Sequence, residues 1–190
     1  MEITLLADML KNENGEIQFN RLSDIFSCRN KDVESFLKNK AVQSSKLYTS
    51  ATYLVSEITD KIDLLGYFTL ATKMLTLKPE NLSASQSKVI KRFVSRDADT
   101  DTFRLPAILI AQFGRNFSDS SKSIKGFDLM RIALERIERA VSLTSGKVIF
   151  LECEPKQKLI DFYEQCGFRL LNNIVYSKDK KELVQMFRII

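Results

Sequence analysis

The order of apolar segments in the C-terminal half is the feature that most constrains the fold. Residues 103–114, FRLPAILIAQFG, are apolar enough to predict a central strand buried on both faces. Residues 148–154, VIFLECE, predict a second buried strand, with one helical pattern between the two strands and another after them. Two further strands, at about 168–177 and 182–190, complete a β-α-β-α-β-β order. This alternation predicts a mixed α/β fold.

Glycine and proline residues mark the ends of the two C-terminal helices. The first helix begins near Gly126, and Gly146 follows it at the distance typical of a helix C-terminus. The second helix opens at Pro155, since proline is favoured at the first helical position, and stops at Gly167. The apolar residues expected on the buried face of the first helix are Met130, Ala133, Leu134, Ile137 and Val141.

The N-terminal half predicts two helices and a pair of strands. A helix of about three turns is expected after Asn30, whose side chain is suited to cap its N-terminus. Residues 51–58 and 64–77 are rich in β-branched and aromatic residues and flank a polar turn, so they predict an antiparallel pair. Residues 84–95 predict a second helix, and the first 26 residues leave helix and strand open. The residues expected to point inward from the second helix are Val89, Ile90 and Phe93.

Composition excludes several classes of site and of protein. The chain has no histidine, which removes Ser-His and Cys-His nucleophiles, His-ligated zinc and imidazole bases. Cys28, Cys153 and Cys166 are far apart, so they predict reduced thiols and no metal site. No stretch approaches the roughly 18 apolar residues of a membrane span, and the N-terminus lacks signal-peptide features, so a cytoplasmic location is expected. No linker divides residues 1–190, which predicts a single domain.

The charge balance favours an anionic ligand. The 29 Lys and Arg residues outnumber the 24 Asp and Glu residues, giving a net charge of +5, and both a phosphate-rich cofactor and RNA would suit it. Residues 120–128, SSKSIKGFD, precede the long helix, whose N-terminus favours phosphate, and Lys122 and Lys125 add charge. A polar connector without a ligand is the alternative. The basic residues suited to hold RNA phosphates, or simply to be solvated, are Lys88, Lys91, Arg92 and Arg96.

The segment from Phe162 to Phe168, FYEQCGF, carries the most specific pattern in the chain. Its apolar residues share one helix face, so core packing alone would explain them. However, the segment resembles the FYxxxGF signature that closes the fold of the GCN5-related N-acetyltransferases (GNATs), and its strand-helix-strand setting matches too. The resemblance covers about residues 27–190. It implies an α/β (α+β) fold, with a central mixed sheet of about six or seven strands, splayed fourth and fifth strands, and about four flanking helices.

The resemblance also implies acetyl-CoA as the acyl donor and no metal. Residues 110–116, IAQFGRN, look like the end of the fourth strand, which in the family binds pantetheine and diverges from its parallel neighbour, here 148–154. Family pyrophosphate loops read roughly Q/R-x-x-G-x-G/A; Gly126 fits, whereas Ile124 and Asp128 stand at the other two small positions. The cofactor-binding residues implied are Gln112, Phe113, Gly114, Arg115, Lys122, Lys125, Gly126, Phe127 and Phe162.

Direct acetyl transfer needs a proton donor for the leaving thiolate and an acceptor for the amine proton. By resemblance the donor is Tyr163, which stays protonated at pH 7 because tyrosine has a reference pKa near 10. A core tyrosine with a satisfied hydroxyl is the alternative. Glu152 is the carboxylate that the family's geometry favours as base, although a water chain would serve. Backbone N–H groups near 113–115 would stabilise charge on the carbonyl oxygen.

The function implied is acetyl-CoA-dependent N-acetylation of a primary amine. Three short segments resemble the branch of the family that includes toxins of toxin–antitoxin pairs, which would imply aminoacyl-tRNA as acceptor and an antitoxin as protein partner. These segments are FSCRN at 26–30, TYL at 52–54 and GYFTLA at 66–71. A catalytically degenerate acyl-CoA-binding or interaction module is the competing hypothesis, since the loop has few glycines. The acceptor amine and the oligomeric state, including a homodimer, are left open.

Overall fold

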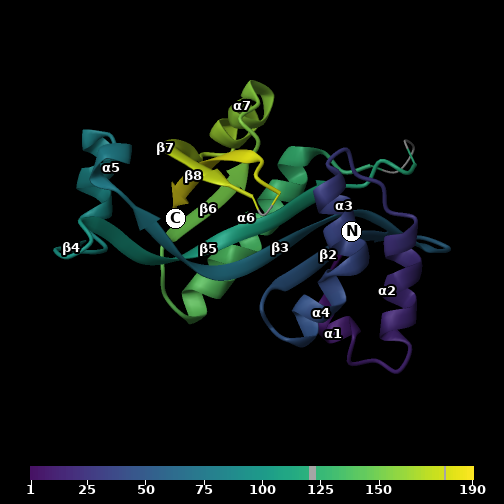
Figure 1. Ribbon diagram of the computed structural model, residues 1–190. Helices are drawn as coiled ribbons and strands as arrows, with labels where there is room; N and C mark the ends of the chain where they lie inside the picture. Colours follow the sequence, from purple (N-terminus) through teal and green to yellow (C-terminus); the bar gives the residue numbers. More distant parts are fainter. Residues whose placement is uncertain (120–122, 178) are drawn as a thin grey trace. The chain divides into compact units, whose positions relative to one another are not determined.

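The computed structural model describes residues 1–119, 123–177 and 179–190 (Figure 1). Over these residues the chain forms eight strands, seven α-helices and one 3-10 helix, so the predicted mixed α/β class is confirmed. It divides into two compact units, 1–71 with 110–137, and 72–109 with 138–190. No helix in the described ranges is long and apolar enough to cross a membrane.

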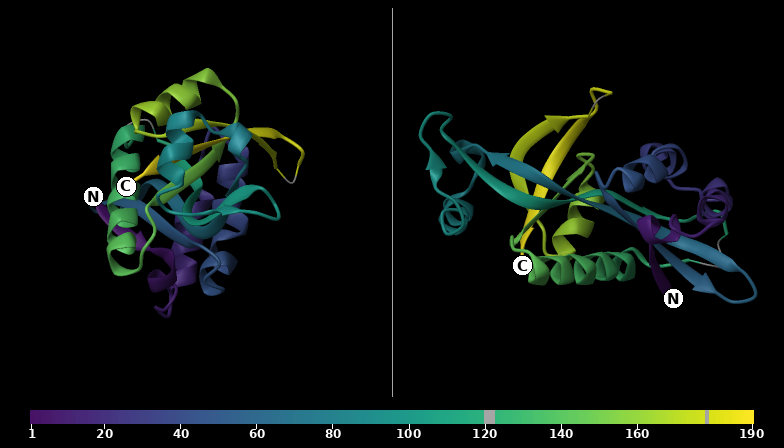
Figure 2. Two further views of the ribbon diagram at one scale, coloured as in Figure 1. Left: turned by 90° about the vertical axis from the view of Figure 1, so that its left-hand side faces the viewer. Right: turned by 90° about the horizontal axis from the view of Figure 1, so that it is seen from below.

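The first unit is built on strands in the order β1-β2-β3-β5, with β1–β2 and β2–β3 paired antiparallel. The long strands β3 and β5 continue into the second unit. Strand β2 pairs with both β1 and β3, and its hairpin with β3 runs from Ala51↔Leu70 to Ile58↔Ile62 (Figure 2). The predicted antiparallel pair is therefore confirmed. The strand bounds are β1 Glu2–Leu5, β2 Ala51–Ile58, β3 Ile62–Leu77 and β5 Thr102–Arg115.

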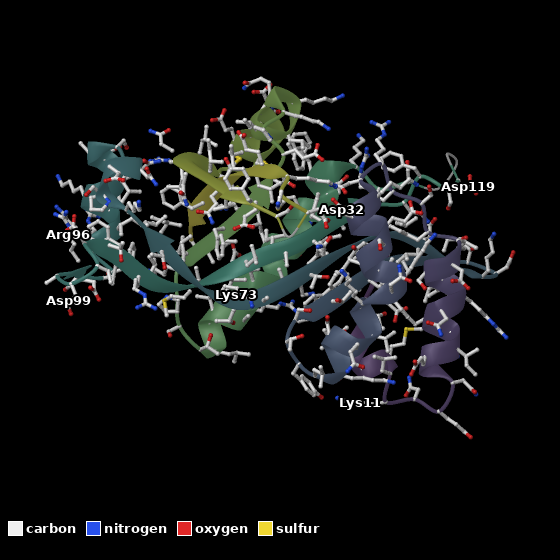
Figure 3. All side chains as sticks on the ribbon, viewed as in Figure 1. Lys11, Asp32, Lys73, Arg96, Asp99 and Asp119 are labelled. Atoms are coloured by element: carbon white, nitrogen blue, oxygen red, sulfur yellow. The ribbon has the colours of Figure 1, made fainter. Side chains whose placement is uncertain are left out.

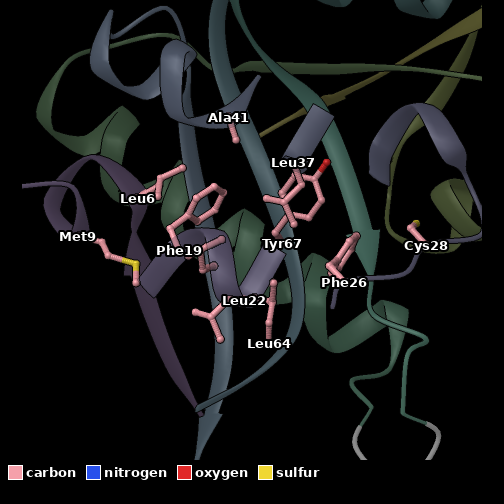
Figure 4. Packing of buried hydrophobic residues seen from close by; sticks show 11 residues of the cluster. Leu6, Met9, Phe19, Leu22, Phe26, Cys28, Leu37, Ala41, Leu64 and Tyr67 are labelled. Carbon is pink, nitrogen blue, oxygen red and sulfur yellow. The ribbon is translucent and has the colours of Figure 1, made fainter. Parts of the chain in front are cut away.

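Four short helices pack against these strands to form the core of the first unit. Phe19, Leu37 and Tyr67 are fully buried and come from three different elements (Figure 4). The Tyr67 ring meets Phe26 edge to face at 5.4 Å, and its hydroxyl donates a hydrogen bond to the Val33 carbonyl. The helix bounds are α1 Leu6–Met9, α2 Gly15–Asp24, α3 Lys31–Asn39 and α4 Ala41–Lys46.

The sequence did not decide between helix and strand for the first 26 residues, which form β1, α1 and α2. The structure also shows why position 15 needs a glycine. Gly15 begins α2 so close to α1 that a Cβ atom would lie 1.8 Å from the Met9 carbonyl oxygen. No other residue fits there. The predicted cap is confirmed at α3, where the Asn30 side chain accepts from the backbone N–H groups of Asp32 and Val33.

The second unit has the strand order β3-β5-β6-β8-β7, with β4 beside β5. The C-terminal strand β8 therefore lies between β6 and β7 and pairs antiparallel with both. A bulge between Leu170 and Ile174 interrupts the β7–β8 register. The strand bounds are β4 Arg96–Asp97, β6 Val148–Cys153, β7 Arg169–Tyr176 and β8 Glu182–Ile189.

Helices complete the second unit around an apolar cluster that includes Leu75, Ile90 and Phe150. Gly167 has φ +84° directly after α7, which confirms the predicted stop because glycine adopts this conformation without strain. The helix bounds are α5 Ala84–Ile90, α6 Gly126–Leu143 and α7 Gln157–Gln165, and the 3-10 helix is Pro79–Asn81. Helix α6 begins in the first unit.

Three predictions of detail were wrong. Strand β5 is not buried on both faces near its start, because Arg104 and Pro106 are exposed between buried neighbours. Helix α5 ends at Ile90 rather than near 95, and this leaves Phe93 44% exposed instead of inward. Helix α7 starts two residues after Pro155. β5 and β6 are neighbours as predicted, whereas their parallel direction and divergence stay predictions.

The loop before α3 generates a test of stability against pH. The Glu34 carboxylate accepts from the Cys28 backbone N–H at 2.9 Å and pairs with Lys31 and Lys38, which lowers its pKa to about 2. Because the folded pKa is depressed, this stabilisation is present above the unfolded pKa, near 4.5, and is lost as the pH falls through about 2. Glu34→Gln should be less stable than wild type at pH 7, and the gap should narrow below about pH 4.5 and close near pH 2.

Denaturant midpoints at several pH values measure this gap. Glu13→Gln is the matched control, because no salt bridge to Glu13 occurs in the described ranges. A pH-independent gap would contradict the charge-based explanation.

Candidate functional site

The residues implied by the resemblance fall into two sets, one in each unit. The first unit holds residues 112–115 at the end of β5 and residues 125–127 at the start of α6. The second holds Glu152 on β6 and Phe162 and Tyr163 on α7. Lys122 lies outside the described residues.

Close packing requires a glycine at the end of β5. A Cβ atom on Gly114 would lie 2.6 Å from Val33 Cγ1 and 3.3 Å from Cys28 Sγ. One on Gly66 would lie 2.9 Å from the Gly114 carbonyl oxygen. Any larger residue at 114 would push α3 away from the strand, so Gly114 has a packing role whether or not its backbone contacts a ligand.

Arg115 links the end of β5 to the start of α6. Its Nη1 donates to the carbonyl of Ile124 at 3.0 Å, two residues before the helix begins. Ile124 stands where family loops carry glycine, and its side chain is buried, so it anchors the loop by apolar burial instead. Lys125 and Phe127 are exposed beside it. Two positive side chains therefore accompany a helix N-terminus, which favours an anion.

Asn116 fastens the residues that follow β5. Its Oδ1 accepts from the backbone N–H groups of Ser27 and Ser118, each at 3.0 Å, and its Nδ2 donates to the Leu64 carbonyl at 2.7 Å. The side chain is only 6% exposed, so these groups have no access to water as a substitute. One amide thus joins β3, β5 and the loop before α3.

Replacing Asn116 should cost more than an ordinary surface change. Asn116→Ala leaves two N–H groups and one carbonyl without a partner, and we expect the free energy of unfolding to fall by about 2 to 4 kcal/mol. Urea denaturation measures it. Asn12→Ala, at an exposed asparagine of the same unit, should change stability by less than about 0.5 kcal/mol. Equal losses in the two variants would show that the hydrogen bonds contribute nothing specific.

Tyr163 differs from the buried tyrosine of the first unit. It is half-buried on α7, its ring meets Phe162 at 5.0 Å and Phe168 at 6.1 Å, and burial raises its pKa above the usual value. Tyr67 donates its hydroxyl proton to a carbonyl, whereas no hydrogen bond to the Tyr163 hydroxyl is found among the described residues. The hydroxyl is therefore protonated at neutral pH and available to a substrate.

Side-chain amides orient the Glu152 carboxylate. Gln185 Nε2 donates to Glu152 Oε1 at 2.9 Å, and Gln185 itself is buried on β8. Asn173, in the bulge of β7, donates to Gln185 Oε1, and Asn81 donates to Asn173 Oδ1 at 3.2 Å. Asn173 and Gln185 each accept from one neighbour and donate to the next, so the chain ends on the carboxylate with a fixed direction.

Neither cysteine near Tyr163 is suited to act as a nucleophile. Burial raises the pKa of the Cys153 thiol to about 11 and raises that of Cys166 above its usual value. A thiol, unlike a thiolate, is a poor nucleophile at neutral pH. No group of three or more metal-ligating side chains occurs among residues 1–119, 123–177 and 179–190. Tyr163 and Glu152 remain the predicted acid and base of this unit.

A cavity of about 270 Å³ lies apart from these groups within the second unit. It is lined by Gln86, Val89, Gly167, Arg169, Phe187, Arg188 and Ile189. Arg188 Nη1 also donates to the Cys166 carbonyl, which holds the end of α7 against β8. None of the residues implied by the resemblance lines this cavity.

Solved structures resemble this chain, although no family model and no curated protein sequence matches it. AtaT complexed with acetyl-methionyl-tRNAfMet is 18% identical, with a TM-score of 0.65 over 96% of this chain and 92% of that chain. A tyrosine-to-phenylalanine variant of KacT is 17% identical, with the same TM-score and coverage. Such a variant of the toxin AtaT, bound to acetyl-CoA and the C-terminus of the antitoxin AtaR, is 17% identical, with a TM-score of 0.57 over 88% and 84%.

The chain has the GNAT fold. The structural likeness thus confirms the fold that the FYEQCGF segment implied. The GNAT strand order also explains why Gln185 stands beside Glu152: β8 lies next to β6. At 17% to 18% identity this likeness shows the fold alone.

Sequence reasoning missed the groups that hold the candidate residues in place. Asn116 stands directly after the predicted strand, and a polar residue between Arg115 and Phe117 gave no sign of three hydrogen bonds. Gln185 is a single polar residue between Val184 and Met186 in a predicted strand, and this pattern gave no sign that its side chain is buried. The only sequence signal for Asn173 was that two asparagines, Asn172 and Asn173, are adjacent within a predicted strand. Such residues disfavour regular strand structure and can indicate a bulge.

Proposed function

We propose that this protein is an acetyl-CoA-dependent N-acetyltransferase that transfers the acetyl group directly to a primary amine. The observation that carries the proposal is Tyr163, whose protonated hydroxyl lacks a hydrogen-bond partner among the described residues of a GNAT fold. A core tyrosine would resemble Tyr67, with its hydroxyl satisfied by a backbone carbonyl. The runner-up, a degenerate binding module, would leave that hydroxyl without a role.

The residues at the β5–α6 junction fit the phosphates of acetyl-CoA. Arg115 and Lys125 supply positive charge, and the α6 N-terminus supplies backbone N–H groups. The backbone of Gln112, Phe113 and Gly114 completes the proposed contacts in the first unit, together with Gly126 and Phe127, and Phe162 is the proposed cofactor contact in the second unit. When bound, acetyl-CoA supplies an activated thioester. Ile124 replaces a family glycine, but its burial keeps its side chain off the loop surface.

Tyr163 serves as the general acid. A leaving thiolate needs a proton, and burial raises the Tyr163 pKa so that the hydroxyl keeps its proton until that moment. The phenol returns to its protonated form by taking up the proton that the amine releases, directly or through water. The buried Cys153 thiol has a raised pKa, which favours direct transfer over an acyl-cysteine route.

Glu152 holds the amine. Gln185 occupies one carboxylate oxygen, and this leaves the other oxygen to accept a hydrogen bond from an incoming amine. Glu152 is exposed on β6, so the amine can approach from solvent. The carboxylate attracts the ammonium form and accepts its proton, or passes it to water.

Aminoacyl-tRNA is the acceptor class that we favour, with an antitoxin as protein partner. AtaT was solved with acetyl-methionyl-tRNAfMet and with the antitoxin AtaR, which supports both assignments. Lys88, Lys91 and Arg92 are exposed on and after α5 and have no salt bridge within the described ranges, so they are suited to RNA phosphates. Arg96 is less suited, because it pairs with Asp101.

Tyr163→Phe tests the mechanism because it removes only the hydroxyl. We expect kcat for acetyl transfer to fall by roughly 10²-fold to 10⁴-fold, the range for a positioned acid. Acetyl-CoA affinity and melting temperature should change little. The assay follows acetyl-CoA consumption with an amine panel that includes aminoacyl-tRNA. Tyr176→Phe, at an exposed tyrosine on β7, is the matched control and should keep full activity. Unchanged turnover in Tyr163→Phe would end this mechanism.

Gln185→Leu tests whether the amide chain orients Glu152. Leucine has a similar volume and keeps the strand packed, but it cannot donate to the carboxylate. We expect kcat to fall about tenfold with an unchanged Kd for acetyl-CoA, since a mispositioned group raises the barrier without affecting donor binding. Asn172→Leu, at an exposed neighbour of the bulge, is the control. A loss of acetyl-CoA affinity instead would assign Gln185 to the donor site.

A further inference from the structure

We infer that Arg29 and Arg115, which both stack on Phe117, form a phosphate-binding clamp in the first unit. Arg29 is not among the residues that the resemblance implied. The choice of phosphate as ligand rests on the proposed function, because acetyl-CoA and aminoacyl-tRNA both carry phosphate esters. The inference names a binding residue and the chemical group that it takes.

The clamp is defined by two cation–π contacts on one ring. The Arg29 guanidinium carbon lies 4.6 Å from the Phe117 ring centroid, and that of Arg115 lies 4.9 Å from it. Phe117 is 38% exposed, and Arg29 is exposed as well. A guanidinium stacked on a ring keeps its N–H groups pointing outward in the plane of the group, where they can bind an anion.

The two arginines carry like charges that repel one another. Within the described ranges neither Arg29 nor Arg115 forms a salt bridge. Nearby carboxylates are used elsewhere: Glu34 accepts from Cys28, Lys31 and Lys38. Asp32 and Asp119, labelled in Figure 3, each have an interaction within the protein. Two like charges beside one ring are stabilised when an anion binds close to both.

The clamp is held in place before any ligand arrives. The Phe117 backbone N–H donates to the Ser27 carbonyl at 2.8 Å, and Asn116 accepts from the Ser27 N–H, so the two strand-flanking loops are fastened together. Arg115 is fixed by its bond to Ile124. A preformed arrangement loses less entropy on binding, which favours a specific anion site over a solvated charged surface.

Phosphate is the anion that fits this arrangement best. Two planar guanidinium groups offer paired N–H donors that match phosphate oxygens. Arg115 also connects to the loop before α6, where the proposed function places donor phosphates. The phosphate can come from the donor or from the acceptor RNA, and binding measurements separate these two sources.

Arg29→Met tests the clamp, because methionine keeps an apolar side chain against the ring but removes the charge. A second variant, Arg29→Lys, keeps the positive charge but lacks the planar guanidinium group with its paired N–H donors. The matched control is Arg21→Met, at an exposed arginine on α2 that gives the same change in net charge. The full chain is titrated with acetyl-CoA, with S-acetyl-pantetheine, which has no phosphate, and with pooled aminoacyl-tRNA. Melting temperatures confirm that each variant is folded.

A donor-phosphate clamp predicts that Arg29→Met weakens acetyl-CoA binding about tenfold and leaves S-acetyl-pantetheine unchanged. An acceptor clamp predicts a similar loss for aminoacyl-tRNA, with a shallower salt dependence. Arg29→Lys should fall between Arg29→Met and wild type. The inference is overturned if both probes bind Arg29→Met as they bind Arg21→Met. Because only binding is measured, loss of turnover with an intact clamp would count against the proposed function alone.

Discussion

The hydrogen bonds of the Asn116 side chain are the interaction on which the arrangement of the first unit depends most. With three hydrogen bonds the side chain joins Leu64 on β3, the end of β5 and Ser27 in the loop before α3. The close approach of Gly114 to Val33 and Cys28 requires that these elements stay together. Arg115 and Phe117 flank Asn116 in the chain, so the same amide fixes where the candidate phosphate-binding groups stand.

Tyr67 and Tyr163 show how the surroundings of a tyrosine distinguish a packing role from a chemical role. Both have a raised pKa because of burial, but Tyr67 has given its hydroxyl to the Val33 carbonyl and is fully enclosed. Tyr163 keeps a half-buried position with no such acceptor in the described ranges. The Tyr163 hydroxyl therefore has no hydrogen bond to a described residue to give up when a substrate binds, which fits a group that donates its proton to that substrate.

In the second unit, a chain of side-chain amides orients the Glu152 carboxylate. A bulge in β7 brings Asn173 toward Gln185, and the insertion of β8 between β6 and β7 brings Gln185 to Glu152. Bulges commonly redirect a side chain in this way next to functional sites. The result is an exposed carboxylate with a defined orientation, which a flexible glutamate on a surface strand would lack.

The sequence by itself determined the mixed α/β class, the β2–β3 hairpin, the Asn30 cap and the stop at Gly167, because these depend on local periodicity and on single-residue conformational preferences. The FYEQCGF segment also led to the GNAT fold. Only the tertiary structure decided that Gln185 is buried beside Glu152, that Phe93 is exposed, and that Arg29 and Arg115 share one aromatic ring. These features depend on strand order and on contacts between residues as far as 92 positions apart, such as Asn81 and Asn173. Local pattern carries no information about such contacts, because they form only when the sheet brings distant segments together.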